Sequence, residues 1–272
     1  MIANARMYAL NDAVVGAWRQ LFVWIALHAD VPLQVIDHAA PAPLSELWRR
    51  PDLGCAMMCG YPWATWNDPD APRPAPLAVP IPSPARFDAT PHYWSDIVVR
   101  ADSRILSERE LAGTRLVFTT MDSQSGYQAP RAFFSAHALA AGGRLFGTTI
   151  GPVVTPRRVV DNLLTGAADA GPLDAWWHDL LRHHEPAVAA RLRVIARTPS
   201  TPMPFFAASG TIAQDAKTRL ITAFDAVATT TDLAETRETL QLLGFARVDP
   251  EDYSTLAERA REIDALGYTR LQ

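Results

Sequence analysis

The sequence predicts an α/β protein with mixed or parallel sheets. Short apolar stretches of strand length alternate with longer stretches in which apolar residues recur at helical spacing. The alternation begins at the N-terminus and gives way to a helical C-terminal segment. All-α and all-β chains do not show this order, and no internal repeat interrupts it.

The first part of the chain begins with a strand followed by a helix. Asn11 or Asp12 is a suitable N-cap for that helix, which carries Val14, Trp18 and Leu21 at helical spacing. For this part of the chain we expect strands at residues 2–8, 33–36 and 55–59, and helices at residues 13–29 and 43–49.

A proline-rich passage separates this part from the next. Eight of the 22 prolines lie between Pro69 and Pro91, and proline interrupts helices and central strands. A surface loop is one interpretation. We favour the other, an extended edge strand at residues 77–81 followed by a passage into a second lobe, because a strongly patterned α/β unit follows at once.

The remaining elements continue the alternation. Pro130 lies in the first turn of its expected helix, where proline is favourable, and Gly142 with Gly143 ends that helix. We expect strands at residues 93–100, 115–120, 167–171 and 192–196, and helices at residues 107–111, 129–140, 156–164, 173–182, 211–229, 232–243 and 253–266.

Composition excludes several classes of function. The formal charge is −4 and no basic block occurs, which argues against nucleic-acid binding. Cys55 and Cys59 lack the spacing of a redox or zinc motif, so we expect two buried residues, no metal site and no cofactor. No stretch is long enough to span a membrane, so we expect no direct membrane insertion. The N-terminus lacks a signal-peptide pattern, which predicts a cytoplasmic chain as written, or a periplasmic one if the start is truncated or misassigned.

The segment from residue 115 to residue 141 carries the best candidate site. A strand is followed by DSQSGYQAP and then by a helix. Ser123, Ser125 and Gly126 place hydroxyls and free N–H groups at a helix start, where anions bind, and Tyr127 adds a donor. Ordinary N-capping by Ser123 or Ser125 is the alternative. A Walker loop is excluded because its lysine and spacing are missing.

Several segments together resemble a known family. They are MYAL (7–10), CGYP (59–62), YWSDIVVRADS (93–103), the strand–SQSGY–helix unit, AADAGPLD (167–174), LRVIARTPSTPMPF (192–205) and the pattern LLGF…DY…L…A…LG (242–267). In this order the chain resembles the substrate-binding proteins of phosphate and phosphonate uptake, the phosphonate-binding-protein-like branch.

The resemblance implies a two-lobed periplasmic-binding-protein-like fold of type 2. Each lobe would hold a mixed sheet flanked by helices, with two crossover strands near residues 87–93 and 197–202. The first lobe would comprise residues 1–90 plus 200–272 and the second residues 91–199. The ligand would lie in the cleft between them, on loops at strand ends.

The resemblance also implies roles for eight residues. The anion-holding loop would consist of Ser123, Ser125, Gly126 and Tyr127. The walls of the cleft would include Tyr8, Tyr61 and Tyr93. Asp174 would meet an amino group on an aminophosphonate-like ligand.

Simpler structural roles stay open for these residues. Tyr8 and Tyr61 could be ordinary half-buried tyrosines, and Asp174 could cap the helix that starts there. We can place no arginine at the site, so a carboxylate or sulfonate would suit the same groups as a phosphonate.

Three functions are compatible with these expectations. The first is a solute-binding protein that holds a small oxyanion without catalysing a reaction, for ABC-type uptake with an ABC permease as partner. The second is a cytosolic enzyme on the same scaffold, such as a menaquinone-pathway lyase or dehydratase, although no catalytic pair is evident. The third is a ligand sensor that signals through a partner chain. We favour the first.

Overall fold

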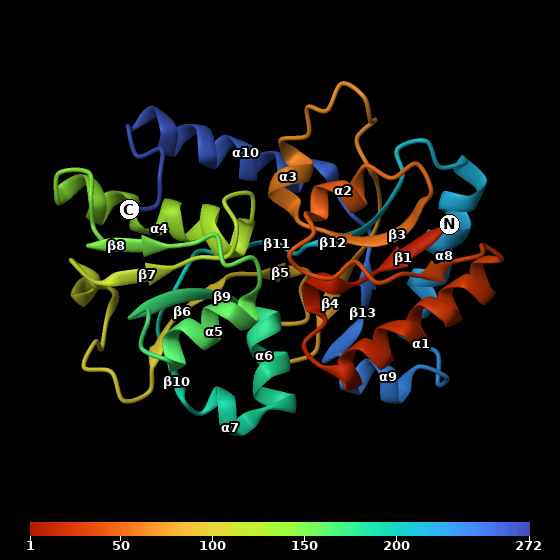
Figure 1. Ribbon diagram of the computed structural model, residues 1–272. Coiled ribbons are helices and arrows are strands. Elements are labelled where there is room, and N and C mark those ends of the chain that lie inside the picture. The colour runs from red at the N-terminus through yellow and green to blue at the C-terminus, as the bar shows by residue number, and fades with distance from the viewer. The chain divides into compact units, whose positions relative to one another are not determined.

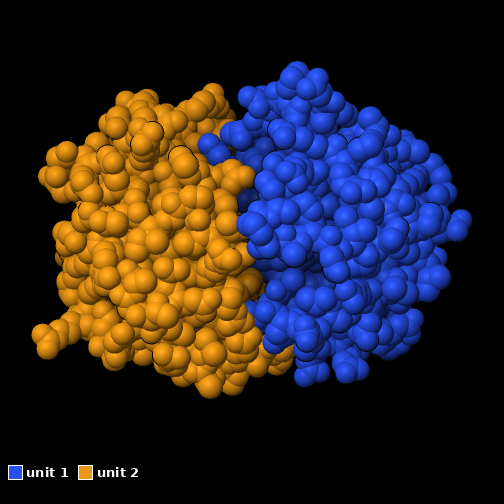
Figure 2. All heavy atoms as spheres, viewed as in Figure 1, with its two compact units in different colours: residues 1–92, 202–252 blue, residues 93–201, 253–272 orange.

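The computed structural model describes residues 1–272 and divides them into two compact units. Unit 1 consists of residues 1–92 and 202–252, and unit 2 consists of residues 93–201 and 253–272 (Figure 2). The chain passes between the units three times: in the short strands β5 (His92–Tyr93) and β11 (Thr201–Pro202), which pair in a sheet of their own, and near the start of α10 (Pro250–Ala265).

Unit 1 contains a six-stranded mixed sheet. Its order is β13-β4-β12-β3-β1-β2, with β1 parallel to both of its neighbours and β12 antiparallel to β3 and β4. The strands are β1 (Ile2–Asn4), β2 (Gln34–Val35), β3 (Leu53–Met58), β4 (Ala75–Pro82), β12 (Phe205–Ala208) and β13 (Leu242–Ala246).

Aromatic residues fix helices on both faces of this sheet. Phe206 packs against Trp18 and Phe224, with ring centroids 5.6 and 5.3 Å away. Its neighbour Phe205 points to the other face and meets Trp63. The helices are α1 (Asp12–Ala29), α2 (Leu44–Trp48), α3 (Gly60–Ala64), α8 (Gln214–Ala226) and α9 (Ala234–Thr239) (Figure 1).

Unit 2 contains a five-stranded mixed sheet of order β10-β6-β9-β7-β8. β7 runs parallel to β8 and β9, whereas β6 is antiparallel to β9 and β10. The end of β9, the end of β7 and the start of β6 therefore meet at one edge. The strands are β6 (Ser95–Arg100), β7 (Arg115–Val117), β8 (Thr148–Ile150), β9 (Ala170–Asp174) and β10 (Leu192–Arg197).

The helices of unit 2 lie on both faces of its sheet. Ile97 and Val99 face a core that includes Phe134 of α4, while Asp96, which directly precedes Ile97, points to the opposite face and contacts α6. The helices are α4 (Ala129–Ala140), α5 (Pro156–Leu164), α6 (Ala175–His184), α7 (Pro186–Ala189) and α10 (Pro250–Ala265).

The C-terminal segment differs from the expectation that residues 200–272 belong to the first lobe, because residues 253–272 lie in unit 2. Arg131 of α4 donates to the carbonyls of Ala260 and Tyr268, at 3.2 and 2.9 Å, and forms an ion pair with Asp264. α10 accordingly lies beside α4 in Figure 1. The bonds of this buried arginine hold the segment to unit 2, although the segment directly follows unit 1 in the sequence.

Three local expectations were wrong. The strand expected at residues 167–171 lies at Ala170–Asp174, and a strand, β13, occupies the end of the helix expected at residues 232–243. The strand expected at the sheet edge, β4, lies between β13 and β12. The ladders on both sides of β4 shift register, and such irregularities accommodate prolines.

The structure also bears on the two cysteines and on membrane spans. Cys55 and Cys59 are buried, as expected, and neither forms a disulfide. None of the helices combines the length and apolar character that a membrane span requires.

Candidate functional site

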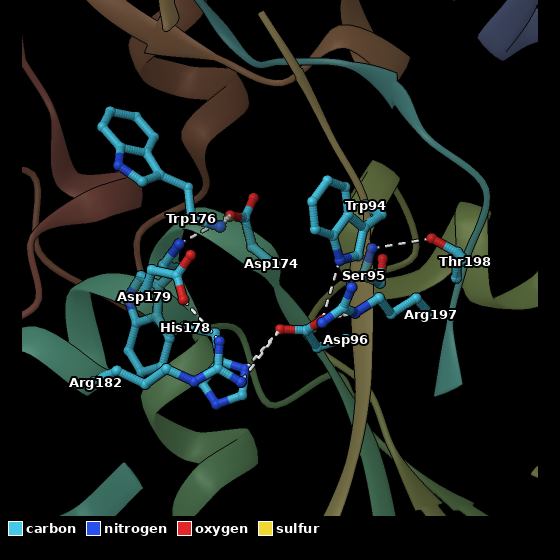
Figure 3. Close-up of polar contacts among 11 residues, drawn as sticks. Trp94, Ser95, Asp96, Asp174, Trp176, His178, Asp179, Arg182, Arg197 and Thr198 are labelled. Atoms are coloured by element: carbon cyan, nitrogen blue, oxygen red, sulfur yellow. Dashed lines mark hydrogen bonds and ion pairs between the residues drawn. The ribbon is translucent and has the colours of Figure 1, made fainter. Parts of the chain in front are cut away.

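Polar side chains gather at the edge of the unit 2 sheet where β6 begins and β9 ends. Ser95 and Asp174 are register partners across these two antiparallel strands, so their side chains lie on the same face. The helical segment that leads into α4 lies over this face and bonds both residues. Figure 3 shows Ser95 and Asp174 at neighbouring strand ends, with Thr198 beyond Ser95.

A helix start delivers N–H groups to this edge. A π-helical turn, Gln124–Gln128, leads directly into α4, and Ser123 caps it by accepting a hydrogen bond from the backbone N–H of Gly126 at 2.9 Å. The N–H of Ser125 lies in the first turn, where N–H groups have no acceptor within the helix. The partial positive charge of a helix start favours an anion there.

Hydrogen bonds hold the helix start to the strand ends. The Ser95 hydroxyl donates to the carbonyl of Ser125 at 2.7 Å. The Ser125 hydroxyl donates to Oδ2 of Asp174 at 3.4 Å. The other oxygen of Asp174 accepts from the backbone N–H groups of Trp176 and Trp177, both at 3.0 Å. Asp174 is therefore the N-cap of α6, the alternative that the sequence left open.

Thr119 is a site candidate that the sequence analysis missed. Its side chain is 6 % exposed, and its hydroxyl has no hydrogen-bond partner in the protein. A Cβ added to Gly126 would lie 1.8 Å from that hydroxyl oxygen, so Thr119 lies directly against the backbone of the helix start. A buried hydroxyl without a partner is unfavourable unless something else binds it.

Ser95 was missed as well. Both Ser95 and Thr119 lie at strand ends beside the predicted loop, and that position was the only sequence signal for them. The pairing of β6 with β9, which places Ser95 beside Asp174, cannot be read from local sequence.

Tyr127 does not join this polar group. It is 3 % exposed, its ring packs against Phe118 with centroids 5.0 Å apart, and its hydroxyl accepts from the N–H of Leu271 at 3.0 Å. The tyrosine is therefore part of the core of unit 2, where it helps to fasten the C-terminal segment.

The other predicted tyrosines lie outside the polar group. Tyr8 follows β1 and Tyr61 follows β3 in unit 1, while Tyr93 ends β5. Tyr8 and Tyr93 are each 1 % exposed. Their role as walls of a ligand site stays a prediction. Of the eight predicted residues, the structure brings together Ser123, Ser125, Gly126 and Asp174.

A buried charge network lies on the opposite face of β6. Asp96 is fully buried and accepts from Nε1 of Trp94 at 3.0 Å, while its other oxygen lies 2.8 Å from Nδ1 of His178. Arg197 and Arg182 approach at 3.5 and 3.9 Å (Figure 3). These partners satisfy the carboxylate, and they lie on the face of β6 opposite to the polar edge.

The arrangement suits the binding of a small anion. None of the residues that bond one another at this edge is basic, so the available groups are hydroxyls, N–H groups and a helix start. The carboxylate of Asp174 already accepts hydrogen bonds on both oxygens.

The chain matches a family model described as the periplasmic substrate-binding protein of phosphonate ABC transporters, over residues 11–253. No curated protein matches the sequence. Among solved structures, a binding-protein component of an ABC phosphonate transporter from Pseudomonas aeruginosa is similar, with a TM-score of 0.83 and 14 % identity. That match covers 100 % of this chain and 90 % of the other.

Two further solved structures resemble the chain. PhnD1 from Prochlorococcus marinus, solved with methylphosphonate, gives a TM-score of 0.79 at 17 % identity over 97 % of this chain and 98 % of the other. A Xanthomonas citri protein solved with ATP gives a TM-score of 0.68 at 16 % identity over 98 % of each chain. Such low identities show the fold, and the fold class expected from the sequence is confirmed. The family match shows more: this chain belongs to the periplasmic substrate-binding proteins of phosphonate ABC transporters.

Proposed function

We propose that the protein binds a small phosphonate- or phosphate-like oxyanion at the polar edge of unit 2. The observation that carries the proposal is the meeting of the Ser123–Gly126 helix start with the partnerless, buried hydroxyl of Thr119. The anion would accept hydrogen bonds from the N–H of Ser125 and from Thr119, and the Ser125 hydroxyl would turn from Asp174 to donate to it as well. Hydrogen bonds to a charged acceptor are short and strong, so several of them can replace the hydration of an oxyanion.

Family membership favours binding over catalysis. The family is a substrate-binding component of transporters. We therefore assign the protein a solute-binding role, with the permease of an ABC transporter as its membrane partner. The family is periplasmic, and we propose the same compartment for this protein in place of the cytoplasm.

The proposal is tested by titrating the purified full chain with methylphosphonate and inorganic phosphate in a calorimeter, and by following its melting temperature. A solute that binds only the folded state stabilises it by about 2.7 kcal/mol at one hundred times Kd. Ser125→Ala removes one donor to the anion. We expect a loss of about 1.5–3 kcal/mol in binding free energy, which is roughly ten- to hundredfold in affinity.

Ser135→Ala is the matched control. Ser135 lies on α4, and its hydroxyl donates to the carbonyl of Ala132 at 2.8 Å, away from the helix start. The control removes the same atoms from the same helix and should leave affinity unchanged. The proposed site is wrong if Ser125→Ala binds with the same affinity as the wild type, or if neither anion raises the melting temperature.

A further inference from the structure

Unit 1 contains a cavity that the proposed function does not use. Its volume is about 280 Å³, close to the lower end of the range in which proteins hold small organic molecules. It lies where β1 and β2 end, and α1 covers it. Residues that line it include Arg6, Trp18, Arg19, Phe22, Ile36 and Asp37.

Arg6 brings a half-buried charge to this cavity without an acidic partner. Its Nη1 donates to the carbonyls of His38 and Ala42, at 2.8 and 2.6 Å. The N–H groups on Nε and Nη2 have no acceptor in the protein. Burial lowers the pKa of the Arg6 guanidinium, and no neighbouring carboxylate opposes that effect. A buried cation is normally paired, and a guanidinium edge fits a carboxylate in bidentate geometry.

Asp37 is the acidic residue that lines this cavity, and it already pairs with another arginine. Asp37 pairs with Arg19 at 3.4 Å, and the side chains of both are exposed, at 89 and 56 %. This pair therefore lies at the solvent side of the cavity and leaves Arg6 without a counter-ion inside.

The wall of the cavity that α1 forms is apolar. Trp18 and Phe22 of α1 are 2 and 1 % exposed, and their rings stack with centroids 6.3 Å apart. Val15 and Ile36 extend this surface. Val15 and Ile36 are only partly buried, so they supply the accessible part of this wall, with the two rings packed behind them.

We propose that this cavity is a second binding site, for a small carboxylate with an aromatic or apolar body. The carboxylate binds the free edge of Arg6, and the body lies against the apolar wall that Val15 and Ile36 form over the rings of Trp18 and Phe22. The site belongs wholly to unit 1 and is separate from the polar edge of unit 2. A hydrated oxyanion without an apolar body would leave this wall unused.

Benzoate is the probe for this site, and benzamide is its neutral counterpart of the same shape. We expect saturable binding of benzoate to the full chain by calorimetry and by ligand-observed NMR, and at least about tenfold weaker binding of benzamide. Arg6→Gln should weaken benzoate by about tenfold and leave methylphosphonate unaffected. Arg247→Gln, at an exposed ion pair with Asp225 in unit 1 that does not line the cavity, is the matched control and should leave benzoate affinity unchanged.

A second variant keeps the test independent of Arg6. Val15→Phe fills the cavity and retains the guanidinium, so it should abolish benzoate binding even if Arg6→Gln folds poorly. Ser125→Ala should bind benzoate as the wild type does. The proposal fails if benzoate does not bind, if benzamide binds equally well, if Val15→Phe still binds benzoate, or if Ser125→Ala loses it.

Discussion

Arg131 of unit 2 and Arg6 of unit 1 both donate to backbone carbonyls, and their remaining donors are satisfied very differently. In unit 2, Arg131 is 3 % exposed and uses Nε and both Nη atoms, on Gln128, Asp264 and two carbonyls. In unit 1, Arg6 uses Nη1 alone. Every N–H group of Arg131 is bonded within the protein, so this residue stabilises the fold and has no donor left for a ligand. Arg6 has further N–H groups on Nε and Nη2, and it lines a cavity.

The same contrast separates the two candidate sites. The polar edge of unit 2 offers hydroxyls and N–H groups of a helix start, which suit a small oxyanion. The cavity of unit 1 offers one cation and an aromatic wall, which suit a carboxylate with a body. A partnerless group points to a ligand, whereas a saturated group points to stability, and the following experiments test this distinction.

The largest effect is expected for Arg131→Gln. The substitution leaves Asp264 and two buried carbonyls without their partner and should lower the free energy of unfolding by about 3 kcal/mol. Arg6→Gln should lower it by only about 1 kcal/mol, since two hydrogen bonds to carbonyls are lost. Urea denaturation of both variants gives the comparison. Equal losses would make Arg6 a structural residue and remove the basis for the second site.

An intermediate effect is expected for Gly126→Ala. The new Cβ would meet Thr119 Oγ1 at 1.8 Å and Ser123 Oγ at 2.9 Å, so the helix start must shift. We expect a loss of about 1–3 kcal/mol in stability and the loss of phosphonate binding.

Gly16→Ala in α1 of unit 1 is the control. A Cβ at Gly16 would meet no atom within 4 Å, and the change should stabilise the helix by about 0.5–1 kcal/mol. Adding Thr119→Ala to Gly126→Ala should recover part of the stability. If Gly126→Ala binds methylphosphonate normally, the helix start is not the anion site.

The smallest effect is expected for the exposed pair of Arg115 and Asp169. Hydrogen bonds from Arg115 hold the pKa of Asp169 below its usual value. The pair therefore stabilises the fold above the ordinary pKa of an aspartate, and this contribution disappears as the pH falls through the lowered value. Asp169→Asn should cost less than about 1 kcal/mol at neutral pH and nothing in acid. A variant equally destabilised at both pH values would contradict this account.

Local chemistry made much of unit 2 predictable. The α4 and α5 ranges follow from Pro130 and Pro156 in their first turns and from apolar residues at helical spacing, and the structure has both as expected. The capping of α1 by Asn11 is confirmed as well. β9 was misplaced and β13 was missed, because short apolar stretches suit a strand or a helix equally well and neighbouring strands decide between them.

The sequence by itself determined the α/β class, the helix start at Ser123–Gly126 and, through the ordered motifs, the family. These depend on contacts within a few residues, which local spacing encodes. Only the tertiary structure decided that Ser95 and Thr119 join the helix start and that Tyr127 faces the core. It also decided that Arg6 lies beside a cavity and that residues 253–272 return to unit 2. Each of these depends on strands and helices distant in sequence, and no local pattern specifies which of them will meet.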